Sequence, residues 1–192
     1  QLWTGSFEGK TTMQEYFEIQ DEIVRKVVAQ TAGHFGAIFR DSSRVPAKKN
    51  IDDFKVFDAI FWYYHFVYEQ NEEIYHKALS ALRYSVHADP DYALGWAVLG
   101  EIYVGGYFMG YDKGIVADLL EEATMCGRKS LKIDVNCQHA YQTLGLAYSF
   151  QQNNHETLKV INDWLKLKQG AAGIMGGMGF CLICCGEYEK GI

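Results

Sequence analysis

The sequence has few of the residues that interrupt helices and no long apolar run. It contains only two prolines, Pro46 and Pro90, in 192 residues, and long stretches without proline favour helices. No window reaches 18 uncharged apolar residues, and the first residues show no basic segment followed by an apolar stretch. Neither a membrane-spanning helix nor a secretory signal is therefore indicated. The cysteines number five, so they cannot all pair, and we expect reduced thiols in a cytoplasmic setting.

Basic side chains are too few for nucleic-acid binding. Eighteen lysines and arginines stand against 24 aspartates and glutamates, and the net charge of −6 would repel a phosphate backbone. Hydrophobic residues make up 48% of the chain and aromatic residues 15%, which is the balance of a folded protein.

The chain divides into four segments. Residues 1–10 alternate weakly and are interpreted as the remnant of a preceding small sheet domain. Over 11–40 the apolar residues recur three or four positions apart, and Thr12 with Glu15 resembles a capping box, so we predict an amphipathic helix. The polar, proline-containing stretch 41–53 is predicted to be a linker, and 54–192 holds a repeat.

The repeat is carried by one eight-residue pattern. W-x-x-L-G-x-x-Y at 96–103 returns as Y-x-x-L-G-x-x-Y at 141–148 and more weakly at 175–182, and Trp62 lies 34 residues before Trp96. Met175 likewise lies 34 residues after Tyr141, but Tyr141 follows Trp96 by 45 residues. We place the 11 extra residues between the two helices of the second unit, around 104–115, where glycines cluster.

A 34-residue period with this pattern resembles the tetratricopeptide repeat, or TPR. The resemblance implies an all-α fold in which helical hairpins stack into a superhelix, an α-solenoid, with about three repeats and a truncated one over 54–192. It implies that Gly100, Gly145 and Gly179 let the two helices of a hairpin approach closely. One departure is Val135, which stands where proline is usual.

The front of the chain narrows the resemblance. L-W-x-x-x-F at 2–7, F-x-I-Q-D-E-I-V-x-x-V at 17–27 and D-P-D-Y-A at 89–93 are similar to the region that follows the catalytic domain of bacterial class III adenylate or guanylate cyclases. The winged-helix domain of some transcription regulators is followed by a similar region. The resemblance implies a non-catalytic regulatory module of a signalling protein; the alternatives are the effector-sensing region of a transcription regulator and a small-molecule sensor.

No motif for catalysis, cofactor or metal binding withstands inspection. Cys181, Cys184 and Cys185 contain a C-x-x-C spacing, but no second ligand pair follows, and reduced core or groove thiols are the favoured interpretation. The glycines of 173–179 lack the strand and the Gly-Lys-Ser/Thr of a phosphate loop. We expect no cofactor, no metal and no catalysis by this chain.

Surface contact is the remaining function class, with a protein or peptide as the partner. In TPR proteins the first helix of each repeat lines an inner groove, which by register gives the groove residues Tyr63, Val67, Ala97, Glu101, Val104, His139, Gln142, Leu146, Ser149, Phe150, Gly176, Phe180 and Ile183. This lining is apolar and aromatic, without the lysine and asparagine that grip a terminal carboxylate, so it suits a hydrophobic peptide, another helix or a second copy. The alternative is that several of these residues only pack against adjacent helices.

Two further surfaces are candidates for contact. Tyr107, Phe108, Met109 and Tyr111 lie among glycines, and either form a flexible contact loop or tuck their rings under the array. With fewer than four complete units, an apolar end of the array needs a cover, which the helix at 12–39, a partner or a second protomer would supply. We therefore predict self-association as a homodimer.

Overall fold

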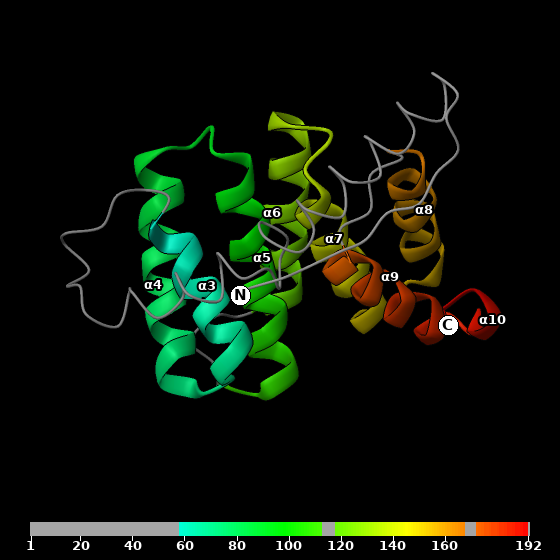
Figure 1. Ribbon diagram of the computed structural model, residues 1–192, viewed down its shortest axis with the longest axis horizontal. Helices are drawn as coiled ribbons and strands as arrows, with labels where there is room; N and C mark the ends of the chain where they lie inside the picture. Colours follow the sequence, from blue (N-terminus) through cyan, green and yellow to red (C-terminus); the bar gives the residue numbers. More distant parts are fainter. Residues whose placement is uncertain (1–57, 113–117, 168–171, 192) are drawn as a thin grey trace, which may run out of the picture.

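The computed structural model describes residues 58–112, 118–167 and 172–191, and these ranges form α-helices and no strand. The predicted strand remnant, amphipathic helix and linker of residues 1–53 lie outside the described residues. Figure 1 shows the helices following one another along the array. Their bounds are α3 Asp58–Glu69, α4 Glu72–Ala88, α5 Ala93–Met109, α6 Leu119–Ile133, α7 Gln138–Phe150, α8 Asn154–Leu165, α9 Ala172–Cys184 and α10 Tyr188–Gly191.

The helices pair into hairpins that stack side by side. Each of α3, α5, α7 and α9 packs against the helix that follows it, and α3 contacts α5, α5 contacts α7 and α7 contacts α9. We call α3, α5, α7 and α9 the A helices, and α4, α6 and α8 the B helices. The predicted all-α array of helical hairpins is confirmed.

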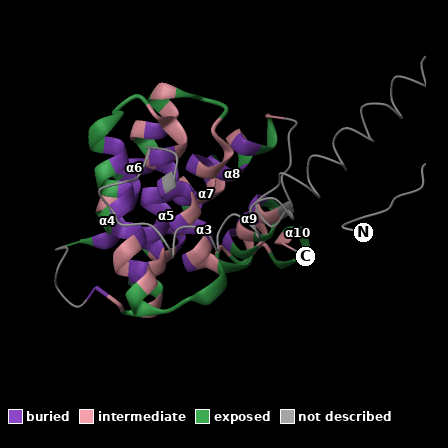
Figure 2. Ribbon diagram, turned by 60° about the vertical axis from the view of Figure 1, so that its left-hand side comes forward, coloured by how far each residue is buried: buried purple, intermediate pink, exposed green. Residues whose placement is uncertain are grey.

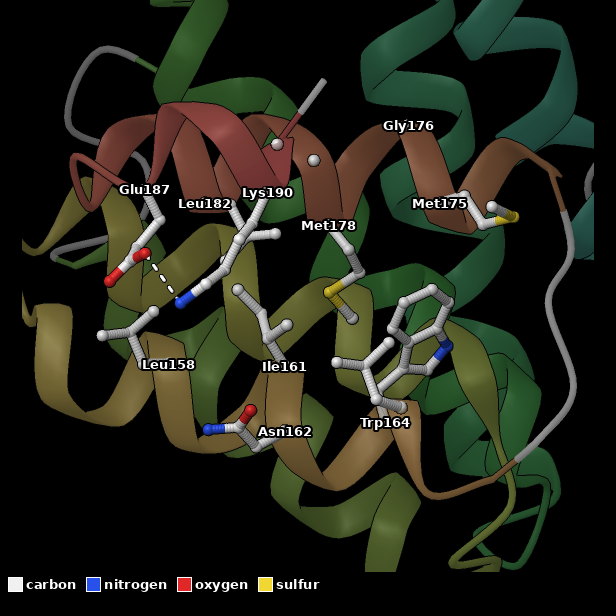
Figure 3. Close-up of a pocket in the computed structure, with 13 residues that line it drawn as sticks. Leu158, Ile161, Asn162, Trp164, Met175, Gly176, Met178, Leu182, Glu187 and Lys190 are labelled. Carbon is white, nitrogen blue, oxygen red and sulfur yellow. Dashed lines mark ion pairs between the residues drawn. The ribbon is translucent and has the colours of Figure 1, made fainter.

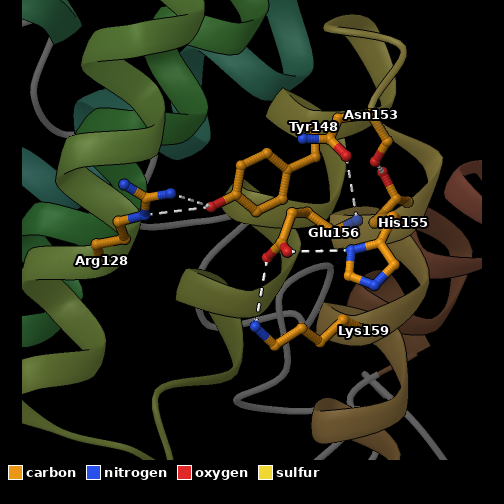
Figure 4. Close-up of polar contacts among 7 residues, drawn as sticks. Arg128, Tyr148, Asn153, His155, Glu156 and Lys159 are labelled. Atoms are coloured by element: carbon orange, nitrogen blue, oxygen red, sulfur yellow. Dashed lines mark hydrogen bonds and ion pairs between the residues drawn. The ribbon is translucent and has the colours of Figure 1, made fainter.

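Hydrogen bonds recur at the predicted register. Arg83 Nε donates to the Tyr103 hydroxyl at 2.9 Å, and Arg128 Nη2 donates to the Tyr148 hydroxyl at the same distance (Figure 4). Both pairs are 20 residues apart, and each guanidinium also lies over the ring of its partner. Equivalent positions in the two units are therefore 45 residues apart, as the sequence pattern predicts.

A second recurring bond explains why Val135 replaces proline without harm. Trp96 Nε1 donates to the carbonyl of Pro90 at 2.8 Å, and the Tyr141 hydroxyl donates to the carbonyl of Val135 at 2.9 Å. The acceptor is a backbone oxygen in both units, so this hydrogen bond forms with either proline or valine at that position.

Each B helix begins at a side-chain cap. Asn71, Asp118 and Asn153 accept hydrogen bonds from backbone N–H groups in the first turns of α4, α6 and α8, which satisfies donors that a helix start leaves free. In α8, Figure 4 also shows the carboxylate of Glu156 beside His155 and Lys159. The caps fix where each hairpin turns back on itself.

The predicted close approach at the repeated glycine holds for only part of the array. A Cβ on Gly100 would lie 2.4 Å from Cγ2 of Thr143 and 3.1 Å from the carbonyl oxygen of Ala123 on α6, its hairpin partner. On Gly145 it would meet only the sulfurs of two α9 residues, at 3.4 and 3.5 Å, which is ordinary contact. The prediction is therefore wrong for Gly145, because the helix opposite leaves it room.

The first part of the glycine-rich insertion, up to Met109, is helical, so the predicted contact loop needs correction. α5 continues through Tyr107, Phe108 and Met109 and ends at Gly110, whose φ of 69° is left-handed. Glycine serves close packing here: a Cβ on Gly106 would lie 2.3 Å from the Tyr75 hydroxyl oxygen. Tyr111 follows the helix and donates a hydrogen bond to the carbonyl of Gln70 at 2.6 Å. Three of the four residues of the predicted contact loop thus belong to α5, which is one turn longer than α7.

Buried residues recur along the helices, as the purple segments of the ribbon in Figure 2 show. They form two clusters, one over the first two hairpins and one over α7, α8 and α9. In the part of the chain that the structure describes, no helix combines the length and apolarity needed to cross a bilayer.

Candidate functional site

The four A helices together line a cavity of about 320 Å³. A cavity of this size is at the small end of the range of ligand pockets, roughly 300–1,000 Å³. We call it the groove. Its lining residues are Tyr63, Phe66, Val67, Glu101, Val104, Gly105, Phe108, Gln142, Leu146, Phe150, Gly173 and Phe180.

Most of the residues predicted to line an inner groove lie in this cavity. Tyr63, Val67, Glu101, Val104, Gln142, Leu146, Phe150 and Phe180 all do so. Among the others, Ala97 is wholly buried and its carbonyl accepts a hydrogen bond from Thr143 at 2.9 Å, so it joins α5 to α7. Ser149 donates to the carbonyl of Gly145 within α7, and Gly176 lines a different cavity. Ile183 is outside the lining.

The predicted lining did not include Phe66, Gly105 and Gly173, and Phe108 was predicted to belong to a contact loop. The signal for two of these was present, because positions 101, 104, 105 and 108 follow the three- and four-residue spacing of one helix face. This spacing was overlooked because the helix was assumed to end before the glycines.

The floor of the groove is a buried carboxylate shared by three helices. Glu101 on α5 is 7% exposed. The hydroxyl of Tyr63 on α3 donates to its Oε2, and Nδ1 of His139 on α7 lies 2.8 Å from its Oε1. In the tautomer that carries its hydrogen on Nδ1, the imidazole donates to this oxygen. His139 thus does not line the groove itself, but it orients Glu101, which does.

Burial raises the pKa of the Tyr63 hydroxyl well above its ordinary value, and the neighbouring charge of Glu101 adds to the shift. The phenol therefore stays protonated and keeps donating to the carboxylate. Loss of either partner would leave a buried polar group without its hydrogen bond, which costs about 1–3 kcal/mol.

One end of the groove carries a ladder of phenylalanine rings. The Phe108 and Phe150 ring centroids are 5.8 Å apart, and those of Phe150 and Phe180 are 6.1 Å apart. Tyr107 also lies against Phe150, at 5.6 Å. Phe108 is 64% exposed and Phe180 is 41% exposed. Aromatic side chains left open to solvent at the edge of a cavity are typical of an interaction surface.

Gln142 supplies the remaining polar group of the lining. Its Oε1 is buried and has no hydrogen-bond partner within the described ranges, although buried polar atoms nearly always have one. The side chain lies against Gly177 of α9, where a Cβ would be 3.0 Å from its Cδ. The groove therefore combines the Glu101 carboxylate with an amide side chain whose oxygen is closed off from solvent, among apolar walls.

The surroundings of Cys181 oppose thiol reactivity. Burial raises the pKa of the Cys181 thiol from 9.0 to about 12, which is opposite to the change that activates a nucleophile or a redox pair. Cys181 lies in the core of the second cluster, whereas Cys184 is exposed. Among the residues whose positions are described, no group of three or more His, Cys, Asp or Glu side chains is placed to hold a metal ion.

A second cavity, of about 780 Å³, lies between α8, α9 and α10. Figure 3 shows Leu158, Ile161 and Trp164 of α8 facing Met178 and Leu182 of α9. The Glu187–Lys190 ion pair, with an N–O distance of 2.9 Å, stands beside it. Leu165 and Met175 at its edge are 61% and 56% exposed. We call this apolar surface the C-terminal face.

Comparisons with known proteins support the fold. No family model matches the sequence, and no curated protein matches it. Among solved structures, it is similar to a thermophilic TPR protein of Thermus thermophilus, with a TM-score of 0.54 and 17% identity over 80% of this chain and 84% of that one. At this identity the likeness shows a TPR-like α-solenoid and nothing about partners.

Proposed function

We propose that this chain is a non-catalytic protein-interaction module that holds a segment of its partner in the groove. The observation that carries the proposal is that all four A helices contribute to one cavity, whose edge exposes Phe108 and Phe180. Tyr107 extends this edge and is the part of the predicted contact surface best placed to meet the partner, since it is 48% exposed. Tyr111 instead holds α5 to the preceding hairpin.

The test compares variants of the two faces of the array. A chain carrying Phe108→Asp and Phe180→Asp should bind the partner, captured from extracts of the source organism and then purified, at least about tenfold more weakly, because exposed aromatic anchors carry much of the binding energy. The control carries Tyr84→Asp and Met125→Asp on the B helices, where the replaced side chains are 53% and 49% exposed. Unchanged binding by the groove variant would contradict the proposal.

The parent protein is proposed to be a bacterial adenylate or guanylate cyclase, with this chain as its regulatory region in the cytoplasm. The support is the sequence pattern at 2–7 and 17–27 together with the repeat. The alternatives are the effector-sensing region of a winged-helix transcription regulator and a small-molecule sensor. A ligand that occupies the groove of a sensor would raise the melting temperature, whereas a protein-interaction module would show no such ligand in a metabolite screen.

The chain is also proposed to form a homodimer through the C-terminal face. Exposed Leu165 and Met175 flank an apolar cavity there, and such surfaces favour association. We expect a dimer mass in light scattering at micromolar protein. Leu165→Glu with Met175→Glu should give a monomer, and Tyr84→Glu, which changes an exposed residue elsewhere, should leave the dimer intact. A monomeric mass for the unaltered chain would contradict this proposal.

A further inference from the structure

We infer that the groove selects a partner segment in which one basic side chain, arginine or lysine, stands among apolar residues. This inference rests on the proposed function and adds the chemistry of the segment that binds. It starts from Glu101, the only acidic or basic side chain among the described residues of the lining. This carboxylate is 7% exposed and lines an apolar cavity. A buried charge is costly unless a countercharge reaches it, and His139, at 2.8 Å, supplies one only when its imidazole is protonated.

The hydrogen bonds already made to Glu101 leave room for a cation. Tyr63 contributes a neutral hydroxyl to one oxygen, and His139 contributes one ring N–H to the other. Two carboxylate oxygens accept about four hydrogen bonds in all. A guanidinium or ammonium group would supply both the positive charge and further donors.

Gln142 adds a second polar side chain to the lining, in addition to the Glu101 carboxylate. Its buried Oε1 has no hydrogen-bond partner in the described part of the chain, and Gln142 shares the lining with Glu101. As far as its described residues go, the groove thus contains a carboxylate and an unpaired amide oxygen and no lysine or arginine. A ligand rich in donors fits the Glu101 carboxylate, whereas the negative charge of a ligand carboxylate or phosphate would be repelled by it.

The walls favour the same ligand. Four phenylalanines belong to the lining, namely Phe66, Phe108, Phe150 and Phe180, and aromatic rings attract cations over their faces within about 6 Å. A cavity of about 320 Å³ is too small for a whole helix. It suits one long side chain, with its apolar neighbours resting on the phenylalanine ladder at the edge.

Net charge adds attraction over a longer range. The first 57 residues carry eight basic and eight acidic side chains, so the whole net charge of −6 belongs to residues 58–192. An acidic array steers basic partners toward itself.

The experiment uses three synthetic peptide libraries that differ only in one fixed central residue. The flanking positions are randomised over apolar and aromatic residues, both ends are blocked, and the centre is arginine, its neutral isostere citrulline, or glutamate. Incubated with the full chain, the arginine library should be retained with at least about tenfold higher affinity than the citrulline library, because citrulline lacks the positive charge and has a carbonyl oxygen in place of one NH₂ donor group. The glutamate library should not be retained.

Two protein variants test whether the preference for arginine over citrulline arises in the groove. Glu101→Gln keeps an acceptor for Tyr63 and a contact for His139 but removes the charge, so the preference for the tightest arginine peptide over its citrulline twin should disappear. Glu121→Gln on α6, outside the groove lining, makes the same change in net charge and should keep the preference. Because the peptide comparison also uses the unaltered chain, the inference stays testable even if a variant folds poorly.

The outcomes separate this inference from the proposed function. Equal retention of the arginine and citrulline libraries, retention of the glutamate library, or an undiminished preference in Glu101→Gln would overturn the inference. Retention of no library would also overturn it, in favour of a second copy or residues 1–57 of this chain as the occupant. If Phe108→Asp with Phe180→Asp still weakens partner binding, the proposed function stands; if it does not, both fail.

Discussion

Gly100→Ala is expected to lower the free energy of unfolding by about 2–3 kcal/mol, whereas Gly145→Ala should leave it unchanged or raise it by up to about 1 kcal/mol. The new methyl group at 100 would lie 2.4 Å from Thr143 Cγ2. Thr143 cannot turn away cheaply, because its one hydroxyl hydrogen is shared between the carbonyls of Ala97 and His139, both 2.9 Å from Oγ1. The backbone oxygen of Ala123, at 3.1 Å, blocks the other side.

Urea unfolding of the two variants at neutral pH measures the difference. Gly145 occupies the same register position one unit later, so both variants gain the same helix propensity of alanine and the comparison isolates the packing. Equal changes in stability at the two positions would show that α5 and α7 do not approach as the structure has them.

Stability should also fall steeply in alkaline solution. Burial raises the pKa of the Cys126 and Cys181 thiols from 9.0 to about 12, and it raises the pKa of the Tyr64 and Tyr75 hydroxyls above their ordinary value of 10.0. These groups stay protonated in the folded chain and ionise in the unfolded one. The contribution of the two thiols to the free energy of unfolding is therefore complete below pH 9. Between pH 9 and 12, the ionisation of each thiol in the unfolded chain lowers the free energy of unfolding by about 1.4 kcal/mol per pH unit.

Denaturant unfolding in the presence of a reductant, from neutral pH into this window, measures the slope. The double variant Cys126→Ala with Cys181→Ala is expected to be less stable at neutral pH, because it leaves small cavities, but its stability should fall less steeply with pH. A slope that the double variant leaves unchanged would mean that the two thiols are not buried in the folded chain.

The sequence predicted the array because the repeat depends on residues that act locally and in the same way in each unit. The offset of 45 residues between Trp96 and Tyr141 reappears in the bonds from Arg83 to Tyr103 and from Arg128 to Tyr148. The groove lining follows from the same register, since the first helices of successive hairpins lie side by side.

Features that depend on distance in space were not predictable in this way. The sharing of Glu101 between Tyr63 and His139 joins residues 38 positions apart on three helices, and no local pattern marks it. The extension of α5 was hidden because glycines usually indicate loops. Here Gly106 lies against the ring of Tyr75, and tertiary packing outweighs the local preference.

Site-specific photo-crosslinking tests most directly the central claim that the A helices form the face that meets the partner. A photo-reactive phenylalanine derivative would replace Phe108 at the edge of the groove or, in a separate chain, Tyr84 on α4; both positions carry exposed aromatic residues, at 64% and 53%. The account predicts a covalent adduct with the partner from position 108 and none from position 84. An adduct from position 84 alone would contradict it.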